Sequence, residues 1–325
     1  MKKLIAAAVA ASLTSVAFAD ISITGSAKAN YKAKETDANA TSNTVSTEHD
    51  IAITGKAGNT TVVTKIAGDD AAAGFTIEDN YLTTSVGDVS VKVGDWDNGN
   101  NYLRESSRTN NALELGTSVG PVGVTYWSGH GDADDKITLK TDLGGVGVKY
   151  VTQAKDEELV LSANVSGIGI TYHADMNDTA NTDKTSVEVT GKVGDMGVKY
   201  VNVDTDSLAY FGGDTFYGDW EHSYGSGGVA AQGTQTGLWY AQKGMDIQAI
   251  ELSTAMAGNA VKFRHIAVDA DDATTDANDR TINRLIVTRP LTSGATMEVM
   301  YTDAQETSDS AQSYSELDVE LSVKF

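Results

Sequence analysis

The chain has 325 residues with 32 glycines, 2 prolines and no cysteine, and its formal net charge is −21. Such an acidic surface attracts cations and repels nucleic acid, so a nucleic-acid partner is excluded. Without cysteine there is no disulfide or thiolate metal site, and a secreted soluble domain would lack a common stabiliser, whereas a large closed β-sheet needs none.

The first nineteen residues have the features of an export signal. Lys2 and Lys3 precede an apolar run, and Ala17-Phe18-Ala19 matches an A-x-A cleavage site before Asp20. We therefore expect a signal peptide at 1–19 and a mature chain at 20–325, with 22 basic and 45 acidic residues and a net charge of −23. Beyond it, no apolar run approaches the roughly 18 residues that a spanning helix needs.

Alternation of apolar and polar residues dominates the mature chain. Over 21–34, residues such as Ile21 and Ile23 share one face and Lys28 lies on the other, and the closing segment YSELDVELSVKF shows the same pattern. A period of two predicts β-strands and is incompatible with a helix. Roughly eighteen to twenty segments qualify. They include 48–57, 88–95, 122–129, 136–143, 145–153, 236–242 and, more weakly, 215–224.

Two kinds of connection alternate between these segments. Glycine-rich tight turns such as LGGVG (143–147) alternate with longer acidic or amide-rich loops such as DADDATTDANDR (269–280). Short turns on one rim and long loops on the other are typical of an outer-membrane β-barrel. A soluble β-sandwich or β-solenoid is the alternative, but it would have to bury Lys149, Lys192 and Lys199 against an apolar core.

A motif of glycine, an apolar residue, a polar residue and tyrosine recurs after four of these turns, twice as GVKYV. We assign its glycines to the turns and its tyrosines to an aromatic girdle at the membrane interface. The girdle comprises Tyr126, Tyr150, Tyr172 and Tyr200. Lys149 and Lys199 then face the lumen, and changing both to glutamate is predicted to raise cation preference without unfolding the barrel.

The start ADISITGSAKANYKA, the glycine-turn hairpins and the terminal Phe325 resemble the Gram-negative general porins of the alphaproteobacterial type. The resemblance implies an all-β, transmembrane, antiparallel up-and-down barrel of sixteen strands, with eighteen left open. It also implies a homotrimer in the outer membrane that passes small hydrophilic solutes and contacts lipid and lipopolysaccharide. Leu321, Val323 and Phe325 would form the signal that the outer-membrane assembly machinery recognises.

In this family the loop after the fifth strand folds inward and constricts the channel. The matching segment is 94–115, which supplies Asp95, Asp97, Arg104, Glu105, Arg108 and Glu114. Alternation places a set of basic residues on the opposing lumen wall, and charges facing one another across a constriction would order polar solutes. This basic wall comprises Lys28, Lys32, Lys56, Lys65, Lys149, Lys199, Lys262, Arg264 and Arg284.

No motif indicates catalysis or a bound cofactor. The five histidines are scattered without metal-ligand spacing, and DWDNGNNYLRE (95–105) fits a calcium loop poorly, so we expect only loose divalent-cation binding by acidic loops. We predict that the protein is not an enzyme but a passive diffusion pore. Its net charge predicts cation preference. The alternatives are an outer-membrane barrel enzyme, an adhesin or a solute-selective channel.

Overall fold

The computed structural model describes thirteen parts of the chain. They are residues 20–36, 41–69, 75–97, 108–129, 135–153, 156–177, 184–205, 209–210, 240–241, 245–270, 280–292, 294–306 and 313–325. The predicted signal peptide lies outside these ranges. None of the described residues belongs to a helix that is long and apolar enough to span a membrane.

The described parts form β-strands joined by turns. The strands are β1 (Asp20–Thr36), β2 (Thr41–Ala57), β3 (Thr60–Asp69), β4 (Phe75–Val86), β5 (Val89–Asp97), β6 (Arg108–Val119), β7 (Val122–Ser128), β8 (Lys136–Leu143), β9 (Val146–Gln153), β10 (Asp156–Val165), β11 (Ile168–Asn177), β12 (Lys184–Val193), β13 (Met196–Thr205), β14 (Ala209–Tyr210), β15 (Tyr240–Ala241), β16 (Met245–Met256), β17 (Asn259–Ala270), β18 (Arg280–Pro290), β19 (Ala295–Glu306) and β20 (Tyr314–Lys324).

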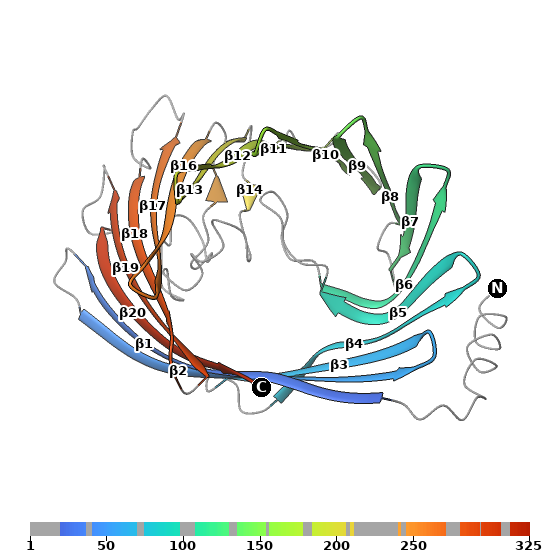
Figure 1. The fold of residues 1–325 in the computed structure, drawn as a ribbon, viewed down its shortest axis with the longest axis horizontal. Helices are drawn as coiled ribbons and strands as arrows, with labels where there is room; N and C mark the ends of the chain where they lie inside the picture. Colours follow the sequence, from blue (N-terminus) through green and yellow to red (C-terminus); the bar gives the residue numbers. More distant parts are fainter. Residues whose placement is uncertain are drawn as a thin grey trace.

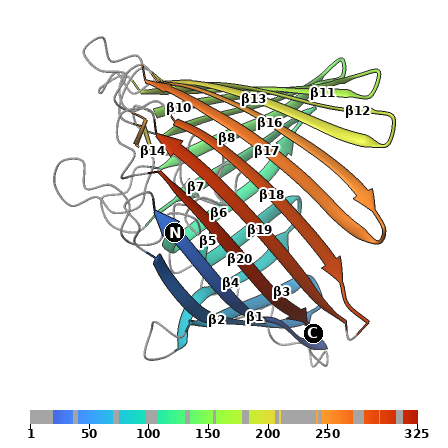
Figure 2. The same ribbon diagram turned by 90° about the vertical axis from the view of Figure 1, so that its left-hand side faces the viewer.

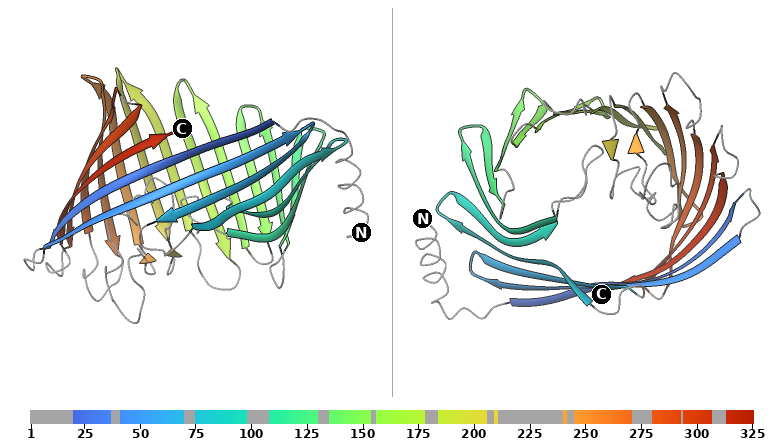
Figure 3. Two further views of the ribbon diagram at one scale, coloured as in Figure 1. Left: turned by 90° about the horizontal axis from the view of Figure 1, so that it is seen from below. Right: turned by 180° about the vertical axis from the view of Figure 1, so that it is seen from behind.

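Eighteen of these strands form one antiparallel sheet in which each strand pairs with the next along the chain. β13 pairs with β16, and β20 pairs with β1, so the sheet closes into a barrel (Figures 1 and 3). The all-β up-and-down barrel agrees with the sequence prediction. The sixteen-strand expectation is wrong, and eighteen, the number left open, is what the structure shows. Strand length varies around the barrel, from seven or eight residues in β7 to β9 to 17 in β1 and β2.

β14 and β15 stand apart from the barrel wall. They pair with each other and lie inside the ring in Figure 1. Of the strand expected at 236–242 the structure describes Tyr240–Ala241, which pair with β14 and not with the barrel sheet. The weaker candidate near 215–224 lies outside the described residues.

Tight turns join the strands at one end of the barrel (Figure 2). Between β8 and β9 the turn is Gly144-Gly145, and both residues have positive φ, 66° and 91°. A two-residue hairpin turn of this handedness matches the twist of the flanking strands and favours glycine. The glycines of the repeated motif, in contrast, lie inside strands rather than in turns. Gly147 belongs to β9, and a Cβ there would lie 2.7 Å from the hydroxyl oxygen of Ser162 on β10.

The register separates an apolar outer face from a polar inner face. On β1 and β2 the row Ile23 and Ile53 is exposed and apolar, whereas the row Lys28 and Glu48 faces the other way. The four tyrosines share the apolar face; Tyr150, for example, stands between Leu139 and Leu159. Their role as an interface girdle stays a prediction. Leu321, Val323 and Phe325 are exposed near the end of the chain, and their role in assembly also stays a prediction.

Candidate functional site

The residues of the predicted basic wall all lie on the inner face of the barrel, opposite the exposed apolar rows. Six of them form ion pairs with acids of neighbouring strands. The pairs are Lys28 with Glu48 (3.3 Å), Lys32 with Glu316 (3.5 Å), Lys65 with Glu78 (2.6 Å), Lys199 with Glu188 (2.7 Å), Arg264 with Glu251 (2.7 Å) and Lys149 with Glu158. These bases are therefore neutralised locally and do not form an uninterrupted positive wall.

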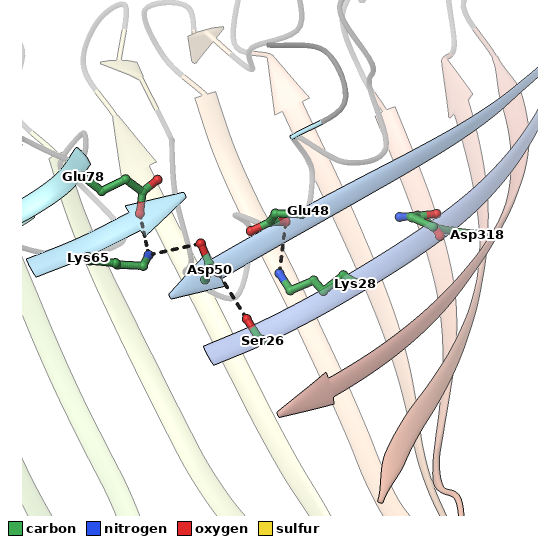
Figure 4. Close-up of polar contacts among 8 residues, drawn as sticks. Ser26, Lys28, Glu48, Asp50, Lys65, Glu78 and Asp318 are labelled. Atoms are coloured by element: carbon green, nitrogen blue, oxygen red, sulfur yellow. Dashed lines mark hydrogen bonds and ion pairs between the residues drawn. The ribbon is translucent and has the colours of Figure 1, made fainter. Parts of the chain in front are cut away.

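Along β1 to β4 the lumen charges change sign from strand to strand (Figure 4). Lys28 on β1 contacts Glu48 on β2, and Lys65 on β3 lies 3.9 Å from Asp50 on β2 and 2.6 Å from Glu78 on β4. Glu78 stands at a register shift between β3 and β4, where it has no partner in the pairing. The extra residue of such a bulge re-aims a side chain, which here brings a carboxylate to Lys65.

A second charged group lies where the barrel closes. The amine of Lys32 on β1 lies 3.5 Å from a carboxylate oxygen of Glu316 and 3.8 Å from one of Asp318, both on β20. The side-chain amide of Asn30 donates a hydrogen bond of 3.2 Å to Asp318. Both carboxylates are buried. The sequence indicated only that these acids form the polar face of the last strand, because their partners lie at the other end of the chain.

Part of the lumen wall is apolar, which the sequence did not predict. Inward residues of β13 and β16 to β19 are buried, among them Val201, Val203, Ile247, Ala249, Ile266, Ile282, Ile286 and Met300. Arg264 and Arg284 of the predicted basic wall lie in this sector and are buried as well. The signal was present in segments such as VKFRHIAV and TINRLIVT, where apolar residues occupy both faces of the strand.

The predicted constriction segment is more strand than loop. Residues 94–97 end β5 and residues 108–115 begin β6, so the connection shortens to 98–107, which lies outside the described residues and contains Arg104 and Glu105. Glu114 faces inward on β6, opposite Lys92 and Trp127. Of the segment's predicted acids, Asp95 accepts a hydrogen bond from the backbone N–H of Asn111. A constriction by this segment stays a prediction.

The β5–β6 hairpin is distorted at the end that leads to this connection. Its register shifts between Gly94 and Trp96, so that Asn110 and Asn111 stand opposite Asp95 alone. Gly94 has a φ of 131° and Asn111 a φ of 52°, both uncommon for an ordinary strand. Figures 1 and 3 show the same end of the hairpin reaching into the ring. The bulge and the inward bend therefore coincide.

Aromatic side chains pack at this bend on the inner face. Trp96 on β5 is 2% exposed and Trp127 on β7 is 8% exposed, and Tyr81 on β4 packs against them. We refer to Tyr81, Trp96 and Trp127 as the aromatic cluster. The rings of Tyr81 and Trp96 meet edge to face with centroids 6.4 Å apart, and the amine of Lys92 lies 4.3 Å from the centroid of each. Sequence reasoning missed the cluster, although alternation places both tryptophans on the inward rows of their strands.

One girdle tyrosine makes a polar contact at the rim. The hydroxyl of Tyr126 donates a hydrogen bond of 2.6 Å to the carboxylate of Asp135, the residue before β8. This hydrogen bond stabilises the ionised acid and lowers the pKa of Asp135. The contact fits a tyrosine whose ring faces the apolar outer surface and whose hydroxyl reaches a polar rim. Among the described residues no cluster of three or more histidine or acidic side chains could hold a metal ion.

A closed barrel of eighteen antiparallel strands, apolar outside and with a charged inner wall, is the fold of a porin-like transmembrane β-barrel. Solved structures with this fold include Acinetobacter baumannii OccAB4, at 11% sequence identity and a TM-score of 0.64, with 94% of this chain and 98% of that chain covered. Pseudomonas aeruginosa OccK2 (OpdF) in complex with glucuronate matches at 10% identity and a TM-score of 0.66 over the same shares, and OpdK with vanillate matches at 8% identity and 0.66, again with 94% and 98% covered. No protein-family model and no curated protein matches the sequence.

Proposed function

We propose that this protein is a water-filled channel of the Gram-negative outer membrane through which small hydrophilic solutes and ions diffuse. The observation that carries the proposal is the barrel itself, with exposed apolar rows outside and ion pairs between inward side chains. Ionisable side chains at membrane depth are stable when they pair with one another or face a water-filled cavity. The predicted signal peptide would deliver the chain to this location, which fractionation of inner and outer membranes tests.

Liposome swelling tests the channel directly. Vesicles containing the folded protein are expected to swell at rates that fall smoothly as neutral sugars increase in size, because diffusion through water depends on solute radius. Vesicles without protein, and vesicles with heat-unfolded protein, are the controls. Absence of swelling with folded protein would contradict the pore and favour the enzyme or adhesin alternative.

A solute-selective channel is the second candidate. It is supported by the fold likeness to OccK2 (OpdF), which was solved in complex with glucuronate, and to OpdK, which was solved with vanillate. The same swelling assay separates the two candidates when charged solutes such as these acids are included. A selective channel gives one solute a rate far above the size trend, whereas a general pore gives none.

We also propose that the channel prefers cations. Acidic residues number 45 against 24 basic ones, and each of the six lumen ion pairs neutralises one acid together with one base, so the excess charge stays negative. Under a KCl gradient in planar bilayers, the reversal potential is expected to indicate cation selectivity. The preference should be sharper near 0.01 M salt, where the Debye length is about 30 Å, than near 1 M, where it is about 3 Å. An anion-selective reversal potential would contradict this proposal.

The constriction and the partners complete the proposal. The inward end of the β5–β6 hairpin would narrow the channel together with the connection that follows it, so that Asp95, Asp97, Arg104, Glu105, Arg108 and Glu114 stand near the narrowest point. The proposed assembly is a homotrimer, which the mass of the protein in detergent tests. Its other partners would be outer-membrane lipid, lipopolysaccharide and the assembly machinery. Loose divalent-cation binding at the acidic loops would appear as a calcium-dependent melting temperature.

A further inference from the structure

We infer that the aromatic cluster and Lys92 are positioning residues of the pore: they hold the β5–β6 hairpin in its inward bend and thereby set the width of the channel. The inference rests on the proposed function, since only a conducting barrel has a width that matters. It concerns side chains that the predicted constriction set does not include. The neighbouring residues Gly94 and Asn111 contribute through the irregular backbone conformation at the bend.

The backbone at the bend is built to deviate from a regular ladder. A β-bulge bends its strand and increases the local twist, and bulges occur preferentially beside functional sites. At Gly94 a Cβ would lie 2.8 Å from Cα of Tyr81 and closer still to the carbonyl oxygen of Asn80, so only glycine fits. The bulge leaves the N–H of Asn111 outside the regular pairing, and the carboxylate of Asp95 accepts it. The backbone N–H that the bulge leaves unpaired in the ladder therefore has a hydrogen-bond acceptor within the same hairpin.

A bulge permits a bend, and side-chain packing selects its direction. The aromatic cluster joins three strands, because Tyr81 comes from β4, Trp96 from β5 and Trp127 from β7. β4 and β7 flank the β5–β6 hairpin on its two sides. Trp96 is the first residue after the register shift and is almost fully buried on the inner face, with Ala112 of β6 as a small neighbour. The hairpin end can leave its inward position only by exposing this indole.

Lys92 adds an electrostatic component to the packing. Its amine lies 4.3 Å from the ring centroids of both Tyr81 and Trp96, within the range of a cation–π interaction. One cation therefore contacts rings from two adjacent strands. Lys92 is also directly opposite Glu114 of the predicted constriction set in the β5–β6 pairing. It is the residue that links the aromatic cluster to the charges of the hairpin.

Single-channel recording of the full-length barrel tests the inference. Trp96→Ala is expected to raise the conductance about twofold or more and to increase current noise, because the hairpin end is released. Trp96→Phe should restore most of the wild-type behaviour. Lys92→Met should shift conductance in the same direction by a smaller factor, and Lys92→Arg should resemble the wild type. Leu285→Ala is the matched control: it lies on the outer face of β18, a strand across the ring from β5 and β6 in Figure 1, and should leave conductance unchanged.

The position of the hairpin end can also be measured directly, as a distance between two spin labels, which tests the inference independently of the conductance. The chain contains no cysteine, so spin labels can be placed at Asp97→Cys on the hairpin end and at Asp269→Cys on β17. The parent should give one narrow distance distribution, and Trp96→Ala should broaden and shift it. An unchanged distribution together with wild-type conductance in folded Trp96→Ala would overturn the inference. A wild-type barrel that does not conduct would overturn the proposed function instead, while the spin-label comparison still decides the positioning role.

Discussion

Lys149→Glu is expected to lower the free energy of unfolding of the barrel by about 1–3 kcal/mol, the usual cost of removing the partner of a buried polar group. The amine of Lys149 pairs with Glu158, whose side chain is 2% exposed, and His173 lies 3.6 Å from the same carboxylate. The substitution removes the positive charge of Lys149 from Glu158 and places a second negative charge beside it. This result would differ from the sequence-based expectation that changing Lys149 and Lys199 leaves the barrel folded.

Lys199→Glu is the matched control on β13. Lys149 and Lys199 are both partly exposed, at 35% and 23%, but their partners differ: Glu158 is 2% exposed and Glu188 is 18% exposed. Water can therefore reach the carboxylate of Glu188 when its cation is replaced, and the loss should be smaller. Denaturant unfolding in detergent, followed by tryptophan fluorescence and by heat-dependent gel mobility, measures both variants. The charge-reversed pair Lys149→Glu with Glu158→Lys should recover part of the loss. Equal unfolding midpoints for the two single variants would contradict the prediction.

Strand positions were predictable wherever lipid borders one face and the lumen the other. The expected strand at 136–143 matches β8 residue for residue, and 122–129 and 145–153 match β7 and β9 within one residue. β2, in contrast, extends from Thr41 although the sequence indicated only 48–57. Among the added residues TSNTVST only Val45 is apolar, so the alternation disappears while the pairing with β1 continues.

The number of strands distinguishes between two kinds of sequence evidence, the alternation pattern and the family resemblance. The tally of alternating segments favoured about eighteen or more strands, whereas the family resemblance favoured sixteen. The structure has eighteen in the barrel, so the residue pattern was the better guide. Within the part of the chain that the structure describes, the pattern overcounted at 236–242, whose described residues Tyr240–Ala241 form β15 inside the ring.

The sequence predicted which face of its strand each residue of the candidate site occupies, but not which residue it pairs with. The alternation of side chains along a strand is enough to place Lys28 and Lys32 on the inner face, because it has a period of two. Partners depend on how strands align across the barrel, and Asn30 and Asp318, which share a hydrogen bond, are 288 residues apart in the chain. The bend at Gly94 and Trp96 was not predictable for a related reason, since a bulge interrupts the alternation on which the prediction rests.

Gly25→Ala is expected to impair closure of the barrel, whereas Gly55→Ala is expected to be tolerated. Gly25 on β1 exchanges backbone hydrogen bonds of 2.8 and 3.0 Å with Phe325, the last residue of the chain. A methyl group at Gly25 would lie 2.6 Å from the Phe325 ring and 2.6 Å from the carbonyl oxygen of Asp50. The ring could rotate away, but the carbonyl belongs to the backbone of β2. Overpacking of this kind costs about 1–3 kcal/mol.

Gly55 isolates that effect because it shares the outer face with Gly25, on the neighbouring strand, and a methyl group there would have no neighbouring atom within 4 Å. Alanine at this position should be neutral or stabilise by up to about 1 kcal/mol, since it restricts the unfolded chain. Refolding into lipid vesicles, scored by heat-dependent gel mobility, should give a lower folded yield and a lower unfolding midpoint for Gly25→Ala alone. Equal yields would mean that the fit of Phe325 over Gly25 does not limit closure. A selective loss would give the terminal phenylalanine a physical role in the closed barrel, separate from any part that it plays in recognition during assembly.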